Sequence, residues 1–207
     1  EFSATIGDGG ASENQQRPAG APLDYSGLAG TTNHSWHVGG YNDLIVADQE
    51  ALRPAQLTLE AWVMGEGSSY YQGAVAKTSS TGWNDGYGLV QVNGAIRFFV
   101  NSWSGAFVEA QLNTGVWSHV AGTYDGTALK LYVDGELAAE QAYTDAIQHS
   151  SAPLAFGAAP NGQYGWGGSL DEVRLWNVAR TAAEIAANYG RPLSGAESGL
   201  AGYWRFD

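Results

Sequence analysis

Apolar and polar residues alternate along several short segments of this chain, and this period of two predicts β-strands. In the segment 57–63, the odd positions are Leu, Leu, Ala and Val, whereas the even positions are Thr, Glu and Trp. The segment 128–133 shows the same alternation, with Leu129, Leu131 and Val133 on one face. Strands of this kind bury one face against a core, so we expect sheets packed on each other.

Pairs of Asn-Gly or Asp-Gly separate neighbouring apolar runs at residues 93–94, 125–126 and 134–135. Such pairs predict tight hairpins because both residues readily adopt positive φ angles. The predicted hairpins span residues 87–100, 117–133 and 128–143. Further strands are predicted at residues 35–38, 44–46, 71–77, 106–112, 154–157, 168–176 and 199–206.

One helix is predicted, over Thr181–Tyr189, because Thr181 can cap it and Glu184 follows three residues later. About a dozen short strands and one short C-terminal helix predict an all-β fold, an antiparallel β-sandwich of the jelly-roll type. Residues 1–22 hold few apolar side chains, so we interpret them as a linker or an irregular strap. The remaining residues, 23–207, are predicted to form a single domain.

Composition narrows the possible partners. Nine basic and 21 acidic residues give a net charge of −12, which repels nucleic acid and anionic lipid but suits neutral ligands or calcium. The chain has no cysteine, which excludes thiol catalysis and disulfides, and no apolar run approaches the ~20 residues that would span a membrane. The 29 Gly, 8 Trp and 11 Tyr are typical of an exported bacterial β-protein, so we expect a secreted or cell-surface location.

A series of motifs occurs in order along most of the chain. They are Leu57-Thr-Leu-Glu-Ala-Trp-Val63, Ala74-Val-Ala-Lys77, Gly86-Tyr-Gly-Leu89, Ile96-Arg-Phe98, Trp117-Ser-His-Val-Ala-Gly-Thr-Tyr-Asp-Gly126, Leu129-Lys-Leu-Tyr-Val-Asp-Gly135, Pro153-Leu-Ala-Phe-Gly157, Gly168-Ser-Leu-Asp-Glu-Val-Arg-Leu-Trp176 and Ala183-Glu-Ile185. Over residues 24–189 the chain resembles the laminin-G-like jelly-roll domain of the concanavalin A-like lectin/glucanase superfamily. The resemblance implies two curved antiparallel sheets, often with a bound calcium.

The C-terminal segment 199–207 departs from the family's order, because a segment like it usually opens such a domain. Here it closes the chain. It either completes a sheet as a last strand or begins a following repeat of a longer chain, and we favour the first because residues 1–22 do not look like a strand.

The carboxylates do not favour an enzyme. Glycosidases hold two carboxylates about 5–10 Å apart across a cleft, and glucanases of this superfamily build them from Glu-x-Asp-x-x-Glu. That triplet is absent, and Glu60 is the one carboxylate on its strand. Alternation predicts Asp171 and Glu172 on opposite faces, one as a metal ligand and the other at the surface. No catalytic residue is therefore assigned.

Calcium is the expected cofactor because hard oxygen ligands are abundant. The resemblance implies that a calcium pins the N-terminal segment to the Asp-Glu-Val strand, with Asp24 and Asp171 at the matching positions. Asn42 and Asp43 are further candidate ligands. The alternative is that Asp24 caps a turn and that Asp171 pairs with Arg174 or another base.

Aromatic residues in loops are the candidates for ligand contact, because sugars present C–H faces to rings and hydroxyls to polar side chains. The candidate ligand-binding residues are Trp83, Asn84, Asp85, Tyr70, Tyr71, Trp103 and Tyr164. The alternative for each ring is that it folds back on its own loop, and Asp85 could instead form a turn before Gly86. Aromatics in the family's framework motifs, such as Trp62 and Tyr124, are expected to pack in the core or on a sheet face, and Trp166 is expected to be structural.

These features favour a non-catalytic, lectin-like carbohydrate-binding module that contains calcium and binds a glycan or polysaccharide. The alternative is a structural or protein-binding domain of a large surface adhesin, with neighbouring domains in a longer chain. A polysaccharide-degrading enzyme is the least favoured reading, and neither nucleic acid nor membrane insertion is expected.

Overall fold

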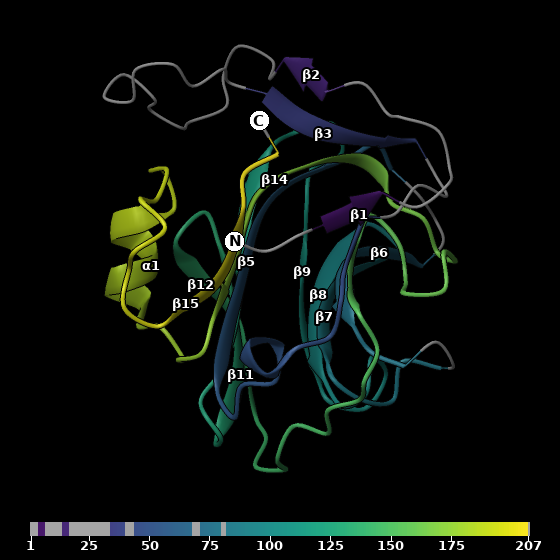
Figure 1. Ribbon diagram of the computed structural model, residues 1–207. Coiled ribbons are helices and arrows are strands. Elements are labelled where there is room, and N and C mark those ends of the chain that lie inside the picture. The colour runs from purple at the N-terminus through teal and green to yellow at the C-terminus, as the bar shows by residue number, and fades with distance from the viewer. Residues whose placement is uncertain are drawn as a thin grey trace.

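Two antiparallel sheets face each other in this protein, and one helix lies outside the larger sheet (Figure 1). The computed structural model describes residues 4–6, 14–16, 34–39, 44–67, 71–79 and 82–206. The fold is therefore the antiparallel β-sandwich that the sequence predicted, and the described residues include one α-helix, near the C-terminus.

The smaller sheet has seven strands in the order β1-β4-β13-β6-β7-β8-β9. Their bounds are β1 Ala4–Ile6, β4 Leu44–Val46, β13 Leu154–Phe156, β6 Gln72–Lys77, β7 Tyr87–Val92, β8 Ala95–Val100 and β9 Phe107–Gln111. The larger sheet has the order β12-β11-β10-β5-β14-β3-β2, and β15 also pairs with β14. Its strands are β12 Glu136–Ala142, β11 Ala128–Val133, β10 Ser118–Tyr124, β5 Leu57–Gly65, β14 Gly167–Trp176, β3 His34–Gly39, β2 Asn14–Gln16 and β15 Leu200–Trp204.

Two of the three predicted tight turns have the expected geometry. Asn93 and Gly94 have φ angles of 51° and 84°, and Asp134 and Gly135 have 50° and 84°. The turn between β10 and β11 differs because three residues separate these strands and Asp125 is not left-handed. Its carboxylate instead accepts hydrogen bonds from the backbone of Thr127 and Ala128.

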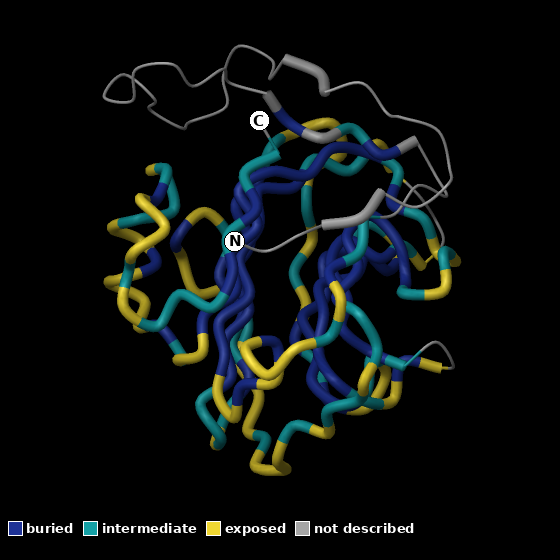
Figure 2. The backbone as a smooth tube through the Cα atoms, viewed as in Figure 1, coloured by how far each residue is buried: buried dark blue, intermediate teal, exposed yellow. Residues whose placement is uncertain are grey.

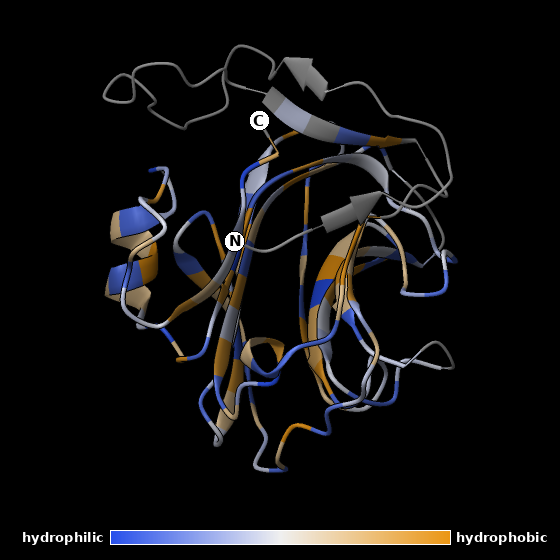
Figure 3. Ribbon diagram, in the orientation of Figure 1, coloured by the Kyte–Doolittle hydropathy of each residue, from blue (hydrophilic) through white to orange (hydrophobic). Residues whose placement is uncertain are grey.

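The core lies between the two sheets and takes side chains from both of them (Figures 2 and 3). On β5, the four odd positions from Leu57 to Val63 are fully buried in this core, as the alternation predicts. Phe98 reaches across from β8 to β10, where a Cβ atom on Gly122 would lie 2.1 Å from its ring. Glycine at that position therefore allows the two sheets to pack closely.

The helix α1, Ala182–Asn188, begins as the sequence predicts. Thr181 accepts a hydrogen bond from the backbone N–H of Glu184, whose carboxylate accepts one from the backbone N–H of Thr181. Such a capping box satisfies two N–H groups that the first turn of a helix leaves without partners. A short 3-10 helix, η1 Glu50–Leu52, precedes β5.

Both chain ends contribute to the sheets. Residues 1–22 were expected to be irregular, but two three-residue strands occur there: β1 pairs with β4, and β2 pairs with β3. Edge pairing uses backbone groups, so it requires no alternation of side chains. At the other end, β15 pairs with β14, with Trp204 opposite Val173. The prediction that the C-terminal segment completes a sheet is confirmed.

The alternation fails at one point of β14. The register with β5 shifts between Asp171 and Arg174, and Glu172 has a φ of 50°. An irregularity of this kind changes which face the following side chains occupy. Both Asp171 and Glu172 are fully buried, so the expectation that one of them lies at the surface was wrong.

Candidate functional site

A cavity of about 530 Å³ lies between loops of the smaller sheet. Its lining residues are Tyr71, Gly82, Trp83, Trp103, Asn161, Gln163 and Tyr164. We call this cavity the aromatic pocket. Four of the seven lining residues belong to the five predicted ligand-contact aromatics, and they come from four separate segments of the chain.

The aromatic pocket rests on the face of the smaller sheet that points away from the core. Val90 and Val92 of β7 and Phe99 of β8 form a second apolar cluster there, and Trp83 belongs to it. Trp103 packs against the same cluster. The sheet therefore gives the pocket a rigid floor.

The four rings form two perpendicular pairs. Tyr71 and Trp103 have ring centroids 4.7 Å apart and planes at 73°. Trp83 and Tyr164 have centroids 5.3 Å apart and planes at 79°. Edge-to-face contacts are a favoured arrangement of aromatic rings, so each pair holds its two side chains in place.

Backbone hydrogen bonds tie the loops together. The N–H of Trp103 donates to the carbonyl of Trp83 at 3.2 Å, and the N–H of Gly73 donates to the carbonyl of Tyr164 at 2.7 Å. Asn161 closes the loop before Tyr164, because its side-chain oxygen accepts from the N–H of Gln163. Rings from distant segments are thereby held around one space.

Two pocket residues have unfavourable backbone angles. Trp83 and Tyr164 have φ angles of 50° and 57°, in the left-handed region that bulky side chains rarely adopt. Strained residues of this kind cluster at functional sites, where the surrounding structure holds them in place.

The rings differ in how much of each is exposed, which places one at the inner wall of the pocket and two at its rim. Trp83 is 5% exposed and stacks on Phe99, with centroids 6.1 Å apart and planes at 12°. Tyr71 and Tyr164 are 44% and 46% exposed. Trp83 was expected at a loop tip and instead forms the inner wall, because the apolar outer face of the sheet lies directly beneath it.

The neighbours of Trp83 play different parts. Asn84 is exposed and does not line the pocket. Asp85 accepts hydrogen bonds from Thr78 Oγ1 and from the N–H of Ser79, each at 2.6 Å. Asp85 thus folds the loop that carries Trp83, which is the turn-forming alternative. Tyr70 lies outside the described residues.

The wall formed by Trp103 is supported by Arg97. Its Nη1 donates to the Trp103 carbonyl at 2.7 Å, and its guanidinium lies 3.6 Å from the centre of the Phe107 ring. Nε and Nη2 donate to Glu109. The outward-facing residues of β8 and β9 therefore hold the loop between them.

Asn161 and Gln163 line the pocket although neither was singled out from the sequence. Both are exposed and neutral, and Asn161 Nδ2 donates to Gln163 Oε1 at 3.1 Å. Their signal was the motif Asn161-Gly-Gln-Tyr-Gly165, in which amides surround a tyrosine.

The predicted calcium site cannot be assembled from the described residues. Asp171 is fully buried, and its Oδ1 accepts a hydrogen bond from the N–H of Glu172. Asp24, Asn42 and Asp43 lie outside the described residues. In the part of the chain that is described, no three His, Cys, Asp or Glu side chains are placed to hold a metal ion. Calcium stays a prediction.

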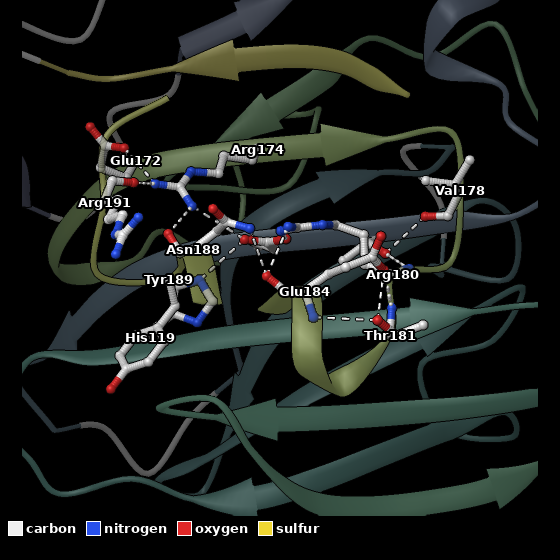
Figure 4. Close-up of polar contacts among 12 residues, drawn as sticks. His119, Glu172, Arg174, Val178, Arg180, Thr181, Glu184, Asn188, Tyr189 and Arg191 are labelled. Atoms are coloured by element: carbon white, nitrogen blue, oxygen red, sulfur yellow. Dashed lines mark hydrogen bonds and ion pairs between the residues drawn. The ribbon is translucent and has the colours of Figure 1, made fainter. Parts of the chain in front are cut away.

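A cluster of charged side chains lies between the larger sheet and α1, away from the aromatic pocket (Figure 4). It consists of Glu60, His119, Glu172, Arg174 and Arg180, and we call it the buried ionic cluster. Glu60 Oε1 accepts from Arg180 at 2.7 Å, and Glu60 Oε2 lies 3.5 Å from Arg174 and 3.4 Å from His119 Nε2. Arg174 also donates to Glu172 at 2.9 Å.

The buried ionic cluster also binds the segment around α1. Arg174 donates to the backbone carbonyls of Asn188 and Arg191, and Arg180 donates to that of Glu184. Burial by itself would raise the pKa of Glu60, but His119, Arg174 and Arg180 outweigh it and lower the pKa from 4.5 to about 2. All five members of the cluster are buried, and their hydrogen bonds hold α1 against the larger sheet.

Residues 38–186 match the family model of the concanavalin A-like lectin/glucanases superfamily. The chain belongs to this family. The family's motifs were the basis of the sequence prediction, and the two facing sheets confirm the architecture. No helix among the described residues is long and apolar enough to cross a membrane.

Solved structures share the concanavalin A-like fold at low identity. A candidate carbohydrate-binding protein from Bacteroides ovatus is 21% identical, with a TM-score of 0.68 over 86% of this chain and 56% of its own. Domain 4 of the extracellular arabinanase AbnA from Geobacillus stearothermophilus, solved with arabinotriose, is 19% identical, with a TM-score of 0.65 over 90% of this chain and 88% of its own. At these identities the likeness shows the fold alone.

Curated relatives match a shorter stretch. Pappalysin-1 of Mus musculus is 34% identical over 80 residues, and that of Homo sapiens is 36% identical over 80 residues. Each alignment covers 36% of this chain and 5% of the relative. This concanavalin A-like domain therefore corresponds to a small part of those proteins.

Proposed function

We propose that this concanavalin A-like domain binds carbohydrate through the aromatic pocket and does not cleave it. The observation that carries the proposal is the convergence of Tyr71, Trp83, Trp103 and Tyr164 around one cavity. Its volume of about 530 Å³ lies within the ~300–1,000 Å³ typical of small-ligand sites. A sugar ring can pack its C–H faces on these walls.

The rim supplies the polar half of sugar recognition. Asn161 and Gln163 carry amide groups that both donate and accept hydrogen bonds, as sugar hydroxyls do. Tyr71 and Tyr164 add hydroxyl groups at an exposed edge. An apolar cavity with a few convergent polar groups is the usual form of a ligand site.

Two of the solved structures that share this fold are also connected with carbohydrate. Domain 4 of AbnA was solved with arabinotriose, and the Bacteroides ovatus protein is described as a candidate carbohydrate-binding protein. A fold alone does not fix a function, so the pocket carries the argument.

The buried carboxylates favour binding over catalysis. The two carboxylates of a glycosidase must flank the glycosidic bond that is cleaved, in a site that the substrate can enter. Glu60 and Glu172 are fully buried, and both contact Arg174 beneath α1. Neither lines the aromatic pocket. This geometry supports a non-catalytic module, and we expect no release of reducing ends from the polysaccharides that it binds.

The test is isothermal titration against a panel of oligosaccharides and polysaccharides, with wild type beside Trp103→Ala and the matched control Val116→Ala. Val116 is 51% exposed and does not line the pocket. We expect at least one glycan to bind wild type and the control, and Trp103→Ala to weaken that binding at least about tenfold. Absence of binding to every glycan would reject the proposal and favour a structural or protein-binding domain of a surface adhesin.

We further propose that the domain works outside the cell and binds a calcium ion, with Asp171 as one of the ligands. The support for calcium is the chemistry of Asp171, whose fully buried carboxylate carries the hard oxygen ligands that calcium prefers. Titration with calcium and differential scanning calorimetry after chelation test this. A bound ion at a hundredfold excess over Kd stabilises the native state by about 2.7 kcal/mol, so an unchanged melting temperature would reject a tightly held structural ion.

A further inference from the structure

The charge of the residues that line the aromatic pocket limits the charge of the sugars that can bind there. Its described lining consists of three residue classes: aromatic rings, two amides and one glycine, none with a formal charge. The adjoining sequence segments 68–70 and 80–81, Ser-Ser-Tyr and Ser-Thr, are also uncharged. The pocket therefore offers a ligand C–H packing and neutral hydrogen bonds.

Arg97 is a cation that lies behind the wall formed by Trp103, with its guanidinium carbon 5.6 Å from the centre of that ring. Arg97 is 9% exposed and does not line the pocket. Three of its nitrogens donate within the protein, two to Glu109 and one to the Trp103 carbonyl. Its flat face lies over Phe107. Recognition of a carboxylate or sulfate requires a cation whose donors face the ligand, and each nitrogen of the Arg97 guanidinium already donates a hydrogen bond within the protein.

Negative charge in the rest of the chain also acts against anionic ligands. The Asp85 carboxylate lies two residues from Trp83 and is only partly buried. The whole chain carries a net charge of −12. An anionic glycan would lose its hydration in a pocket that returns no ionic contact, and burial of such an unpaired charge is costly.

We infer that the aromatic pocket selects uncharged sugar units and rejects glycans that carry carboxylate or sulfate groups. This inference rests on the proposed carbohydrate-binding function and adds the class of ligand. It follows from the lining residues, so the rejection acts at the pocket and not only through the net charge of the protein.

The test uses matched ligands that differ only in charge: uronic-acid oligosaccharides and the same oligosaccharides after reduction of their carboxyl groups, with neutral plant and bacterial glycans beside them. We expect affinity for neutral ligands to exceed that for their acidic counterparts by at least about tenfold. The preference should persist in ~1 M NaCl, where the Debye length is only ~3 Å. A preference that disappears in high salt would assign it to net charge alone and overturn the inference.

A gain of function provides the second arm. Gln163→Lys places a cation at the rim of the pocket, and Gln163→Glu is the matched control. We expect the lysine variant to gain at least about fivefold in affinity for the acidic oligosaccharides and the glutamate variant to gain nothing. Acidic ligands that bind wild type as tightly as neutral ones, or no gain in the lysine variant, would overturn this inference and leave the proposed function standing. No binding to any glycan would overturn both.

Discussion

Trp83 and Phe99 stack almost in parallel, with ring centroids 6.1 Å apart and planes at 12°. Phe99 belongs to β8, so this contact fixes the loop that carries Trp83 to the outer face of the smaller sheet. The same indole also makes an edge-to-face contact with the ring of Tyr164. Trp83 thus serves both as core for the outer face of the sheet and as a wall of the aromatic pocket.

Truncation of this residue should therefore cost stability as well as binding. We expect Trp83→Ala to lower the free energy of unfolding by about 3–5 kcal/mol, because it leaves a cavity over Phe99. Urea unfolding measures the loss. Trp83→Phe, which keeps a ring over Phe99, should lose clearly less, and equal losses in the two variants would contradict this account.

The rim tyrosines separate binding from stability. Tyr71 is 44% exposed and Tyr164 is 46% exposed, so removal of either ring leaves the cores intact. We expect Tyr71→Ala and Tyr164→Asn to weaken glycan binding about tenfold each, a change of ~1.4 kcal/mol, with little change in melting temperature. Asparagine is chosen at Tyr164 because it tolerates the φ of 57°. Tyr71→Phe and Tyr164→Phe keep the rings and should retain most of the affinity; equal loss in them would assign recognition to the hydroxyl groups.

The composition of this site could be predicted in part from sequence. Tyr71, Trp103 and Tyr164 were singled out because they are aromatic residues in segments where the family is loop-like or variable. The sequence could not show that Trp83 turns inward. That depends on the apolar outer face of β7 and β8, which alternation alone assigns to solvent.

Arg97 positions the pocket without lining it. It holds the Trp103 carbonyl and packs on Phe107, so its loss should loosen the loop between β8 and β9. We expect Arg97→Gln to weaken glycan binding about three- to tenfold. The matched variant Glu109→Gln should lose less affinity for the glycan, because in it Arg97 keeps its hydrogen bond to the Trp103 carbonyl. The decisive measurement is hydrogen exchange of the Trp103 amide, which donates to Trp83. Unchanged exchange with unchanged affinity would remove Arg97 from this role.

The C-terminal strand is part of the domain. Tyr203 of β15 donates its hydroxyl to Glu172 and accepts a hydrogen bond from the backbone N–H of Leu193. Trp204 packs on Phe156, with centroids 4.9 Å apart. We expect removal of residues 199–207 to lower the melting temperature by at least ~10 °C or to prevent folding, whereas Tyr203→Phe should cost about 1–3 kcal/mol by leaving Glu172 short of a donor. A truncated chain as stable as wild type would contradict this.

The strands and turns were predictable because their signals are local. Alternation located β5 and β11, and Asn93-Gly94 located the turn between β7 and β8. The buried ionic cluster was not predictable, because Glu60 and Arg174 lie on the face of β5 and β14 that alternation assigns to solvent. The segment around α1 covers that face, and only the tertiary fold shows it.

The buried ionic cluster should make the protein sensitive to acid. Burial is the main influence on His119 and lowers its pKa, and the pKa of Glu60 is lowered to about 2. In each case the unfolded chain takes up a proton before the folded chain does as the pH falls. Stability should therefore decline first below pH ~6.5, where unfolded His119 becomes charged, and further from pH ~4.5 toward 2 through Glu60.

The two groups can be separated by variants. The Glu60 shift corresponds to a loss on the order of 3 kcal/mol between pH 4.5 and 2, measured by urea unfolding. His119→Gln should flatten the curve near pH 6 and keep the steep fall below pH 4.5. Glu60→Gln should cost about 3–5 kcal/mol at neutral pH, because it leaves Arg180 without its carboxylate, and should flatten the fall below pH 4.5. Where that variant is too unstable to fold, the wild-type curve decides: a free energy of unfolding that stays constant from pH 7 to 3 would mean that neither group is linked to folding.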